Sequence, residues 1–209
     1  PTRRSSDLLK IFNGTDMLIA AHCEDQETIK ANIEKYRQKY KGADDIPVNA
    51  HPGIRSVPAC YASSELAVRL ARIAGARLHI LHVSTAKELQ LFSDEPLEDK
   101  NITSEACVAH LLFTLAHYNS LGARVKCNPA VKRKTDREAL RAAVNSGLID
   151  VIATDHAPHL LSEKEGGALK AMSGMPMIQF SLVSMLGLVD EGVFSLETVV
   201  QKMCHAPAR

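Results

Sequence analysis

The sequence lacks a strong net charge, a long apolar run and an obvious targeting segment. Its 209 residues carry a formal net charge of +1, so no basic surface indicates a nucleic-acid partner. No apolar run approaches the roughly 20 residues of a membrane span, and the first residues do not resemble a signal peptide. Hydrophobic residues make up 45% of the chain, which argues against disorder. We therefore expect a folded protein with neither a nucleic-acid nor a membrane partner.

The sequence also lacks paired cysteines at metal-binding or redox spacing. It has five cysteines, an odd number, and no CxxC motif. A disulfide scaffold is therefore not expected, and the pattern fits a reducing compartment. We predict a cytoplasmic protein. The five are Cys23, Cys60, Cys107, Cys127 and Cys204.

Short apolar segments alternate with amphipathic ones along the whole chain. This alternation predicts an α/β fold with a parallel sheet, and the length suits a single domain over residues 1–209. We expect strands within 17–25, 77–85, 101–107 and 148–159, an extended segment at 123–131, and a loop at 41–58. We expect helices at 5–14, 26–40, 62–76, 86–94, 108–122, 136–147, 177–192 and 195–206.

Four polar residues lie at or near the carboxyl ends of the four predicted strands. They are His22, His82, Glu105 and Asp155. Active sites of parallel α/β folds lie at this end of the strands. Imidazole and carboxylate groups together suit zinc, which makes a bound water a usable nucleophile. The pattern favours a metal site, with Asp155 expected to be buried there.

Each of these residues also has a purely structural interpretation. A lone histidine in a strand is more often a packed, hydrogen-bonded residue than a ligand. His79 precedes His82 by three positions, so strand alternation places the two on opposite faces, and we select His82 because it is nearer the strand end. Cys23 is expected to point away from His22. Glu24 and Asp25 are expected to begin the next helix, where acids favour the helix dipole.

Six segments in a fixed order carry a more specific signal. "ATDHAPH" (153–159) is the strongest, and "TSEACVAHLL" (103–112) has Ala109 where a related pattern has the first of two consecutive histidines. The others are "IAAHCED" (19–25), "HPGIRSVP" (51–58), "LHILHVST" (78–85) and "CNPAVKRKTDREAL" (127–140). Together they resemble the dihydroorotases, cyclic amidohydrolases of the amidohydrolase superfamily, over nearly the whole chain.

The resemblance implies a fold, a cofactor and a reaction. The family fold is a (β/α)8 TIM barrel of the metal-dependent hydrolase type, with one or two zinc ions at the carboxyl-terminal rim. By resemblance, His22 and His82 bind one ion and Asp155 binds the other. Asp155 also acts as the catalytic base that moves a proton to the leaving nitrogen. The family reaction is the reversible hydrolysis of dihydroorotate to N-carbamoyl-L-aspartate, in pyrimidine biosynthesis.

The resemblance also implies substrate contacts. His159 and Asn128 match residues that hold the substrate carboxylate, and Ser173 and Gly174 match positions whose backbone contacts the ring. Glu105 matches an acid of the family pattern whose role stays open. Dihydropyrimidinases and hydantoinases resemble the same fold, but their substrates lack the ring carboxylate, so His159 favours a dihydroorotase. The alternative for His159 is a loop residue hydrogen-bonded to the backbone.

Part of the family pattern is missing. The family pattern begins with an HxH pair and continues with a bridging lysine on a later strand. This chain has no HxH pair. Its candidate lysine, Lys10, lies in the segment 5–14, which suits a helix better than a strand. We therefore expect strands five to eight of the barrel, with the amino-terminal half as a missing partner. Two histidines leave a weak, open zinc site, so the isolated chain should hold fewer ions or none and be nearly inactive. We expect the complete enzyme to be a homodimer.

Two other functions stay open. One is another cyclic amidohydrolase, such as a dihydropyrimidinase, hydantoinase or allantoinase, which substrate assays would distinguish. The other is a dihydroorotase-like chain without metal that serves as a scaffold for a partner such as aspartate carbamoyltransferase. The presence of His22, His82, Asp155 and His159 argues against the scaffold.

Overall fold

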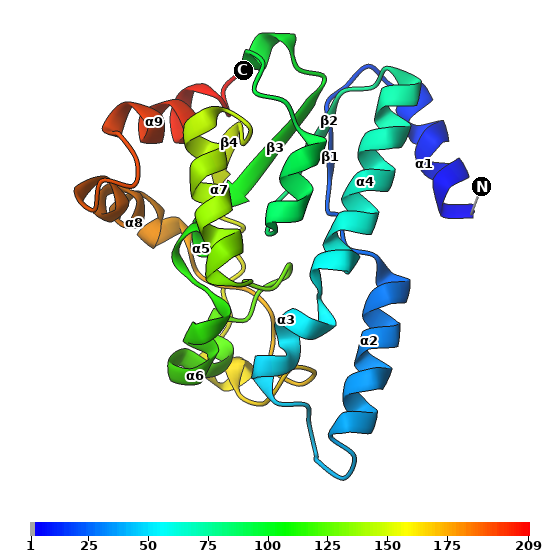
Figure 1. Cartoon of the computed structure of the whole chain (residues 1–209), viewed down its shortest axis with the longest axis vertical. Helices are drawn as coiled ribbons and strands as arrows, with labels where there is room; N and C mark the ends of the chain where they lie inside the picture. The colour runs from blue at the N-terminus through cyan, green and yellow to red at the C-terminus, as the bar shows by residue number, and fades with distance from the viewer. Residues whose placement is uncertain (1–2) are drawn as a thin grey trace.

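The computed structural model describes the backbone of residues 3–209 and the side chains from Ser6 onward. Its sheet has four parallel strands in the order β1-β2-β3-β4 (Figure 1). Each strand pairs with the next strand of the chain, as in a barrel, whereas the strand order of a doubly wound sheet reverses. The predicted partial (β/α) barrel is confirmed. The strands are β1 Ile19–Ala21, β2 Leu78–Ile80, β3 Ile102–Cys107 and β4 Val151–Ala153.

The register of the sheet brings the strand ends to one rim. Ala21 of β1 pairs with Ile80 of β2, so these two strands finish side by side. Cys107 of β3 pairs with Ala153 of β4, so those two also finish together. The residues that directly follow the strands therefore emerge at the same edge of the sheet. The rim is thus set by backbone pairing before any side chain is considered.

Helices cover the sheet and extend past its rim. Figure 1 shows α4 and α7 along the sheet, and α2, α3 and α6 beyond the end at which the strands finish. Pro58 lies in the first turn of α4, where a missing backbone N–H is tolerated. The helices are α1 Arg3–Asn13, α2 Gln26–Lys39, α3 His51–Ile54, α4 Val57–Ala74, α5 Val108–Leu112, α6 Tyr118–Leu121, α7 Lys134–Ser146, α8 Ile178–Asp190 and α9 Leu196–Val200.

The core forms two apolar clusters. The larger lies between the sheet and its helices and contains Leu78 and Ile80, both fully buried. The smaller lies under α2 and α3 and includes Ile29 and Ile54. Burying one such side chain contributes about 1.5–3 kcal/mol. The smaller cluster packs α2 and α3 against each other and against the start of α4.

Three sequence predictions about local structure are wrong. The helix expected at 108–122 breaks after α5, because Phe113 and Thr114 are extended and the N–H of Leu115 donates to the carbonyl of Lys132. The loop expected at 41–58 contains a 3-10 turn, all of α3 and the start of α4. The extended segment at 123–131 begins within a 3-10 turn, Gly122–Val125. At the first of these positions a contact distant in sequence decides the local conformation.

Two further features bear on the sequence analysis. Within residues 3–209, no helix is long and apolar enough to cross a membrane. None of the five described cysteines forms a disulfide; four are buried and Cys204 is exposed. The single-domain boundary at 1–209 stays a prediction.

Candidate functional site

His22 and His82 meet at the rim. His22 directly follows β1, and His82 lies two residues beyond β2. Nδ1 of His22 lies 2.8 Å from Nε2 of His82, and the two rings meet edge to face with centroids 4.7 Å apart. At that distance one nitrogen carries a proton and the other offers a lone pair. The two strands thus deliver a hydrogen-bonded imidazole pair.

His82 and Asp155 share an unusual backbone conformation. Their φ angles are 41° and 44°, and no other non-glycine residue of the described chain has a positive φ. Each lies two residues beyond the end of its strand, β2 or β4. Such a conformation costs on the order of 1–3 kcal/mol and persists where the surrounding structure enforces it, commonly at functional sites. The chain therefore holds two candidate ligands in strained positions at one rim.

Burial differs from what the sequence predicts at this rim. His82 is 5% exposed, whereas the side chain of His22 is 43% exposed and Asp155 is exposed. Burial and the nearby His22 lower the pKa of His82, while the charges of Asp155 and Glu105 oppose that shift. A neutral imidazole is the form that binds metal. The expectation that Asp155 is buried is wrong for this chain, because its side of the rim faces solvent.

Glu105 and His79 also face this site. Nε2 of His79 lies 3.1 Å from Oε2 of Glu105, and Nδ1 of His79 lies 2.8 Å from Oγ1 of Thr103. The backbone N–H of His82 donates to Oε1 of Glu105 over 3.2 Å. Glu105 thus contacts the side chain of His79 and the backbone of His82. Strand alternation ends with β2 at Ile80, and that His79 and His82 point to opposite faces stays a prediction.

The histidine pair fits two ligands of a tetrahedral metal. Two zinc–nitrogen bonds of about 2.0–2.1 Å separate their nitrogens by roughly 3.3 Å, so the pair would open by roughly 0.5 Å to admit an ion. Asp155 is close enough for its charge to act on His82. Among the described side chains, no three His, Cys, Asp or Glu residues form a group that could hold a metal. The described rim offers two adjacent imidazoles and a nearby carboxylate.

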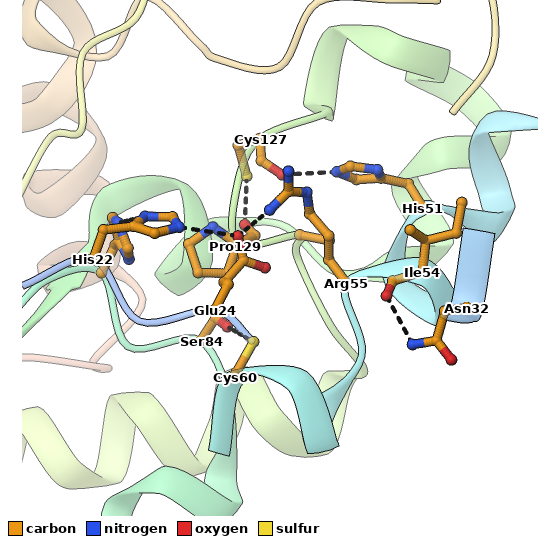
Figure 2. A network of polar contacts seen from close by, with 12 residues as sticks. His22, Glu24, Asn32, His51, Ile54, Arg55, Cys60, Ser84, Cys127 and Pro129 are labelled. Carbon is orange, nitrogen blue, oxygen red and sulfur yellow. Dashed lines mark hydrogen bonds and ion pairs between the residues drawn. The ribbon is translucent and has the colours of Figure 1, made fainter. Parts of the chain in front are cut away.

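Behind His22 lies a buried carboxylate. Glu24 has a side chain with no solvent exposure, and its Oε2 lies 3.3 Å from Nε2 of His22 (Figure 2). Oε2 also accepts a hydrogen bond from Nη1 of Arg55. Burial raises the pKa of Glu24, but the His22 contact and the Arg55 charge outweigh it and hold the pKa below its ordinary value. Glu24 does not begin α2 as predicted; Asp25 does, and accepts from the N–H of Thr28.

Asn128 lies between two backbone anchors. Nε2 of His51 lies 2.9 Å from the carbonyl oxygen of Cys127, and Nε2 of His110 lies 2.9 Å from that of Pro129. Burial lowers the pKa of each histidine to about 3, so both are neutral and donate to the carbonyls. Oδ1 of Asn128 is buried and has no hydrogen-bond partner in the described part of the chain. The segment thus presents an unsatisfied acceptor from a fixed backbone.

His159, Ser173 and Gly174 lie together. Nε2 of His159 lies 3.1 Å from the carbonyl oxygen of Ser173. The N–H of Gly174 donates to the carbonyl of Lys126 over 2.9 Å. Nζ of Lys164 donates to the carbonyls of Lys126, Met172 and Gly174 at 3.0, 2.8 and 2.7 Å. Three backbone groups of Ser173 and Gly174, the residues expected to contact a ligand, are therefore bonded within the chain here.

Gly174 is required at its position. Its φ is +143°, and an added Cβ would lie 2.5 Å from the carbonyl oxygen of Ala157. That contact is much shorter than any side chain tolerates. The loop that carries Ser173 therefore packs directly on the segment between Asp155 and His159.

Five residues that shape the site are not predicted from the sequence: Glu24, Arg55, His51, His110 and Lys164. Only Glu24 had a usable signal, because residues two apart in an extended segment share a side and His22-Cys23-Glu24 follows a strand. The other four act through contacts between segments distant in sequence. Whether Asn128, His159, Ser173 and Gly174 contact a substrate stays a prediction.

Comparisons with known proteins extend these observations. The Amidohydrolase family matches residues 6–209. A curated dihydroorotase of Leifsonia xyli is 33% identical over 99% of this chain and 45% of its own length. One from Deinococcus radiodurans is 31% identical over 92% of this chain and 44% of its length. The chain thus spans less than half the length of these curated relatives, as expected for a dihydroorotase-like partial barrel.

Solved structures agree on the fold. An L-hydantoinase (dihydropyrimidinase) from Arthrobacter aurescens superposes with a TM-score of 0.88 at 28% identity, over 98% of this chain and 46% of that one. A D-hydantoinase from a Bacillus species, AR9, gives a TM-score of 0.81 at 22% identity, over 94% and 44%. The second likeness concerns the fold alone. Both match this chain to less than half of a longer barrel protein.

Proposed function

The chain belongs to the amidohydrolase family, and on that premise we propose that it forms part of the active site of a zinc-dependent dihydroorotase. The reaction is the reversible hydrolysis of dihydroorotate to N-carbamoyl-L-aspartate. One observation carries the proposal: His22 and His82 meet at the rim, with His82 and Asp155 both held at positive φ. Members of this family generally depend on a metal, and two imidazoles with a carboxylate suit zinc.

Each proposed role follows from the position of its residue. His22 and His82 hold zinc, with Asp155 beside them. When bound, zinc supplies Lewis-acid activation of the ring amide and of water. Asp155, exposed at the rim, accepts a proton from the attacking water and passes it to the ring nitrogen as the amide bond breaks.

Carboxylate recognition favours dihydroorotate over neutral cyclic amides. His159 lies on the loop beside Ser173, and a protonated imidazole would make a charge-assisted hydrogen bond to a substrate carboxylate. The side-chain amide of Asn128 has two N–H donors for the same group, on a backbone fixed from both sides. Hydantoin and allantoin have no such carboxylate, so they would leave these donors unpaired.

A second candidate is a hydantoinase-type cyclic amidohydrolase. The observation that favours it is the close superposition on the L-hydantoinase from Arthrobacter aurescens. The two candidates share the zinc site and differ in how they use His159. The predicted homodimer and cytoplasmic location belong to either of them.

The test measures hydrolysis of dihydroorotate, hydantoin and allantoin. The protein is expressed both as the 209 residues and as the longest reading frame that contains them. We expect dihydroorotate turnover by the longer product, little by the 209 residues alone, and loss of turnover in Asp155→Asn. The His159→Gln variant should have a lower kcat/KM for dihydroorotate, mainly because KM rises. Preference for hydantoin, or equal turnover by Asp155→Asn, contradicts the proposal.

A further inference from the structure

The Glu24 carboxylate makes close contacts with two side chains, His22 and Arg55. Its Oε2 contacts both Nε2 of His22 and Nη1 of Arg55. Its Oε1 is buried without a hydrogen-bond partner within the described residues. An ionised carboxylate without solvent contact is costly unless it is paired. Its pairing here is concentrated on the oxygen that faces His22.

Arg55 is fixed independently of Glu24. Nδ2 of Asn32, in α2, donates to the carbonyl of Ile54 over 2.9 Å (Figure 2). The same Nδ2 donates to Oγ of Ser56 over 3.2 Å. These bonds hold the residues on both sides of Arg55 against α2. The N–H of Asp25, next to Glu24, donates to the carbonyl of Ala59 over 2.9 Å. The arginine and the glutamate therefore come from two segments tied to each other by backbone contacts.

The two contacts of His22 favour one position for its proton. Nε2 of His22 lies 3.3 Å from Oε2 of Glu24, and a carboxylate attracts an N–H and repels a lone pair, so this contact favours the hydrogen on Nε2. Nδ1 is then unprotonated and accepts from Nε2–H of His82, 2.8 Å away. The lone pair on Nδ1 of His22 therefore points to the space between the two rings. A metal ion shared by His22 and His82 would bind in that space.

We propose that Glu24 is a positioning residue, held by Arg55, that keeps the His22 proton on Nε2 and so directs the Nδ1 lone pair to the metal position shared with His82. Carboxylates behind metal-binding histidines fix the tautomer and orientation of the ring, and their loss typically weakens metal binding roughly 10- to 100-fold. The inference rests on the proposed zinc site. Arg55 acts one step further back, because it orients the carboxylate.

The variants separate this role from general stability. Glu24→Leu with Arg55→Leu removes both charges, so that no unpaired ion is left buried. Glu24→Gln keeps a hydrogen-bond acceptor at the same place without the charge. Glu88→Gln is the matched control, because Glu88 is equally buried and bonds Ser64 and Thr85 instead of His22.

Two measurements are made on the purified 209-residue chain and on the longer product. Imidazole ¹⁵N NMR of the metal-free protein reports the tautomer of His22, and calorimetric titration with zinc reports affinity. We expect Nε2–H alone in the unmodified protein and in Glu24→Gln, and a mixture of tautomers in the double variant. Zinc affinity should fall roughly 10- to 100-fold in the double variant, less in Glu24→Gln, and remain unchanged in Glu88→Gln.

Several results would overturn the inference. A His22 proton on Nδ1 in the unmodified protein does so without any variant, even if the double variant fails to fold. Equal zinc affinity in the double variant, or equal loss in Glu88→Gln, also does so. Failure of the proposed function gives a different result. A protein that has the expected tautomer but does not turn over dihydroorotate supports the positioning role of Glu24 and contradicts the proposed dihydroorotase activity.

Discussion

Acid should destabilise this fold through two buried histidines. His51 and His110 each donate Nε2–H to a backbone carbonyl beside Asn128. Burial lowers the pKa of each to about 3 in the folded chain, against about 6.5 in an unfolded one. The unfolded chain therefore binds more protons between those values. The stability that these histidines preserve is fully present above pH 6.5 and is lost progressively as the pH falls toward 3.

The magnitude at pH 5 follows from the two pKa values. Integrating proton uptake from pH 7 to pH 5 gives a loss of about 2 kcal/mol for each histidine, and about 4 kcal/mol for both. Little solvent screening reduces this value, because His51 is 2% exposed and His110 is 3% exposed. A loss of that size is a large fraction of the stability of an ordinary domain.

The assay is urea unfolding followed by circular dichroism at pH 7 and pH 5. The matched variant is His51→Gln with His110→Gln, because the glutamine Nε2 can donate to the same carbonyls and does not titrate. Carboxylates titrate equally in both proteins, so the difference between them isolates the histidines. We expect the double variant to lose about 4 kcal/mol less than the unmodified chain between the two pH values. Equal losses would refute the burial argument.

Two further substitutions test particular contacts. Lys164→Met removes three hydrogen bonds to backbone carbonyls, so amide hydrogen exchange in the loop that carries Ser173 should become at least about tenfold faster. The control is Lys170→Met, at an exposed lysine, which should leave the exchange rates unchanged. Equal rates in the two variants would mean that Lys164 does not hold the loop. Lys100→Met leaves the buried carboxylate of Asp150 without its 2.8 Å partner and should lower the free energy of unfolding in urea by about 3–5 kcal/mol. The control is Arg69→Met, at an exposed ion pair, which should lower it by less than about 1 kcal/mol. Similar losses in the two variants would contradict the stabilising role of the buried pair.

Periodicity was enough to predict the sheet and the rim. Strands of apolar residues alternate with helices, and the order of parallel strands places the residues after them at one edge. His22, His82 and Asp155 were found this way because each follows a strand directly or by two residues. The family resemblance added roles that spacing alone does not give. The position of the site therefore follows from local pattern and topology together.

Long-range contacts explain what the sequence did not reveal. The helix expected through Phe113 breaks because the N–H of Leu115 pairs with Lys132, seventeen residues later. The positive φ of His82 lies beyond the end of β2 at Ile80, where the period-two pattern of a strand no longer predicts the direction of a side chain. Arg55 reaches Glu24 only because α2 and the turn before α4 pack together. Such contacts depend on the folded chain and leave no periodic signal.

The most direct test of the account is anomalous diffraction at the zinc edge from crystals of the product of the longer reading frame, grown with zinc. The account predicts a peak between Nδ1 of His22 and Nε2 of His82, roughly 2.0–2.1 Å from each, with the rings moved apart from their 2.8 Å contact. A zinc peak elsewhere, with the two imidazoles still bonded to each other, would contradict it.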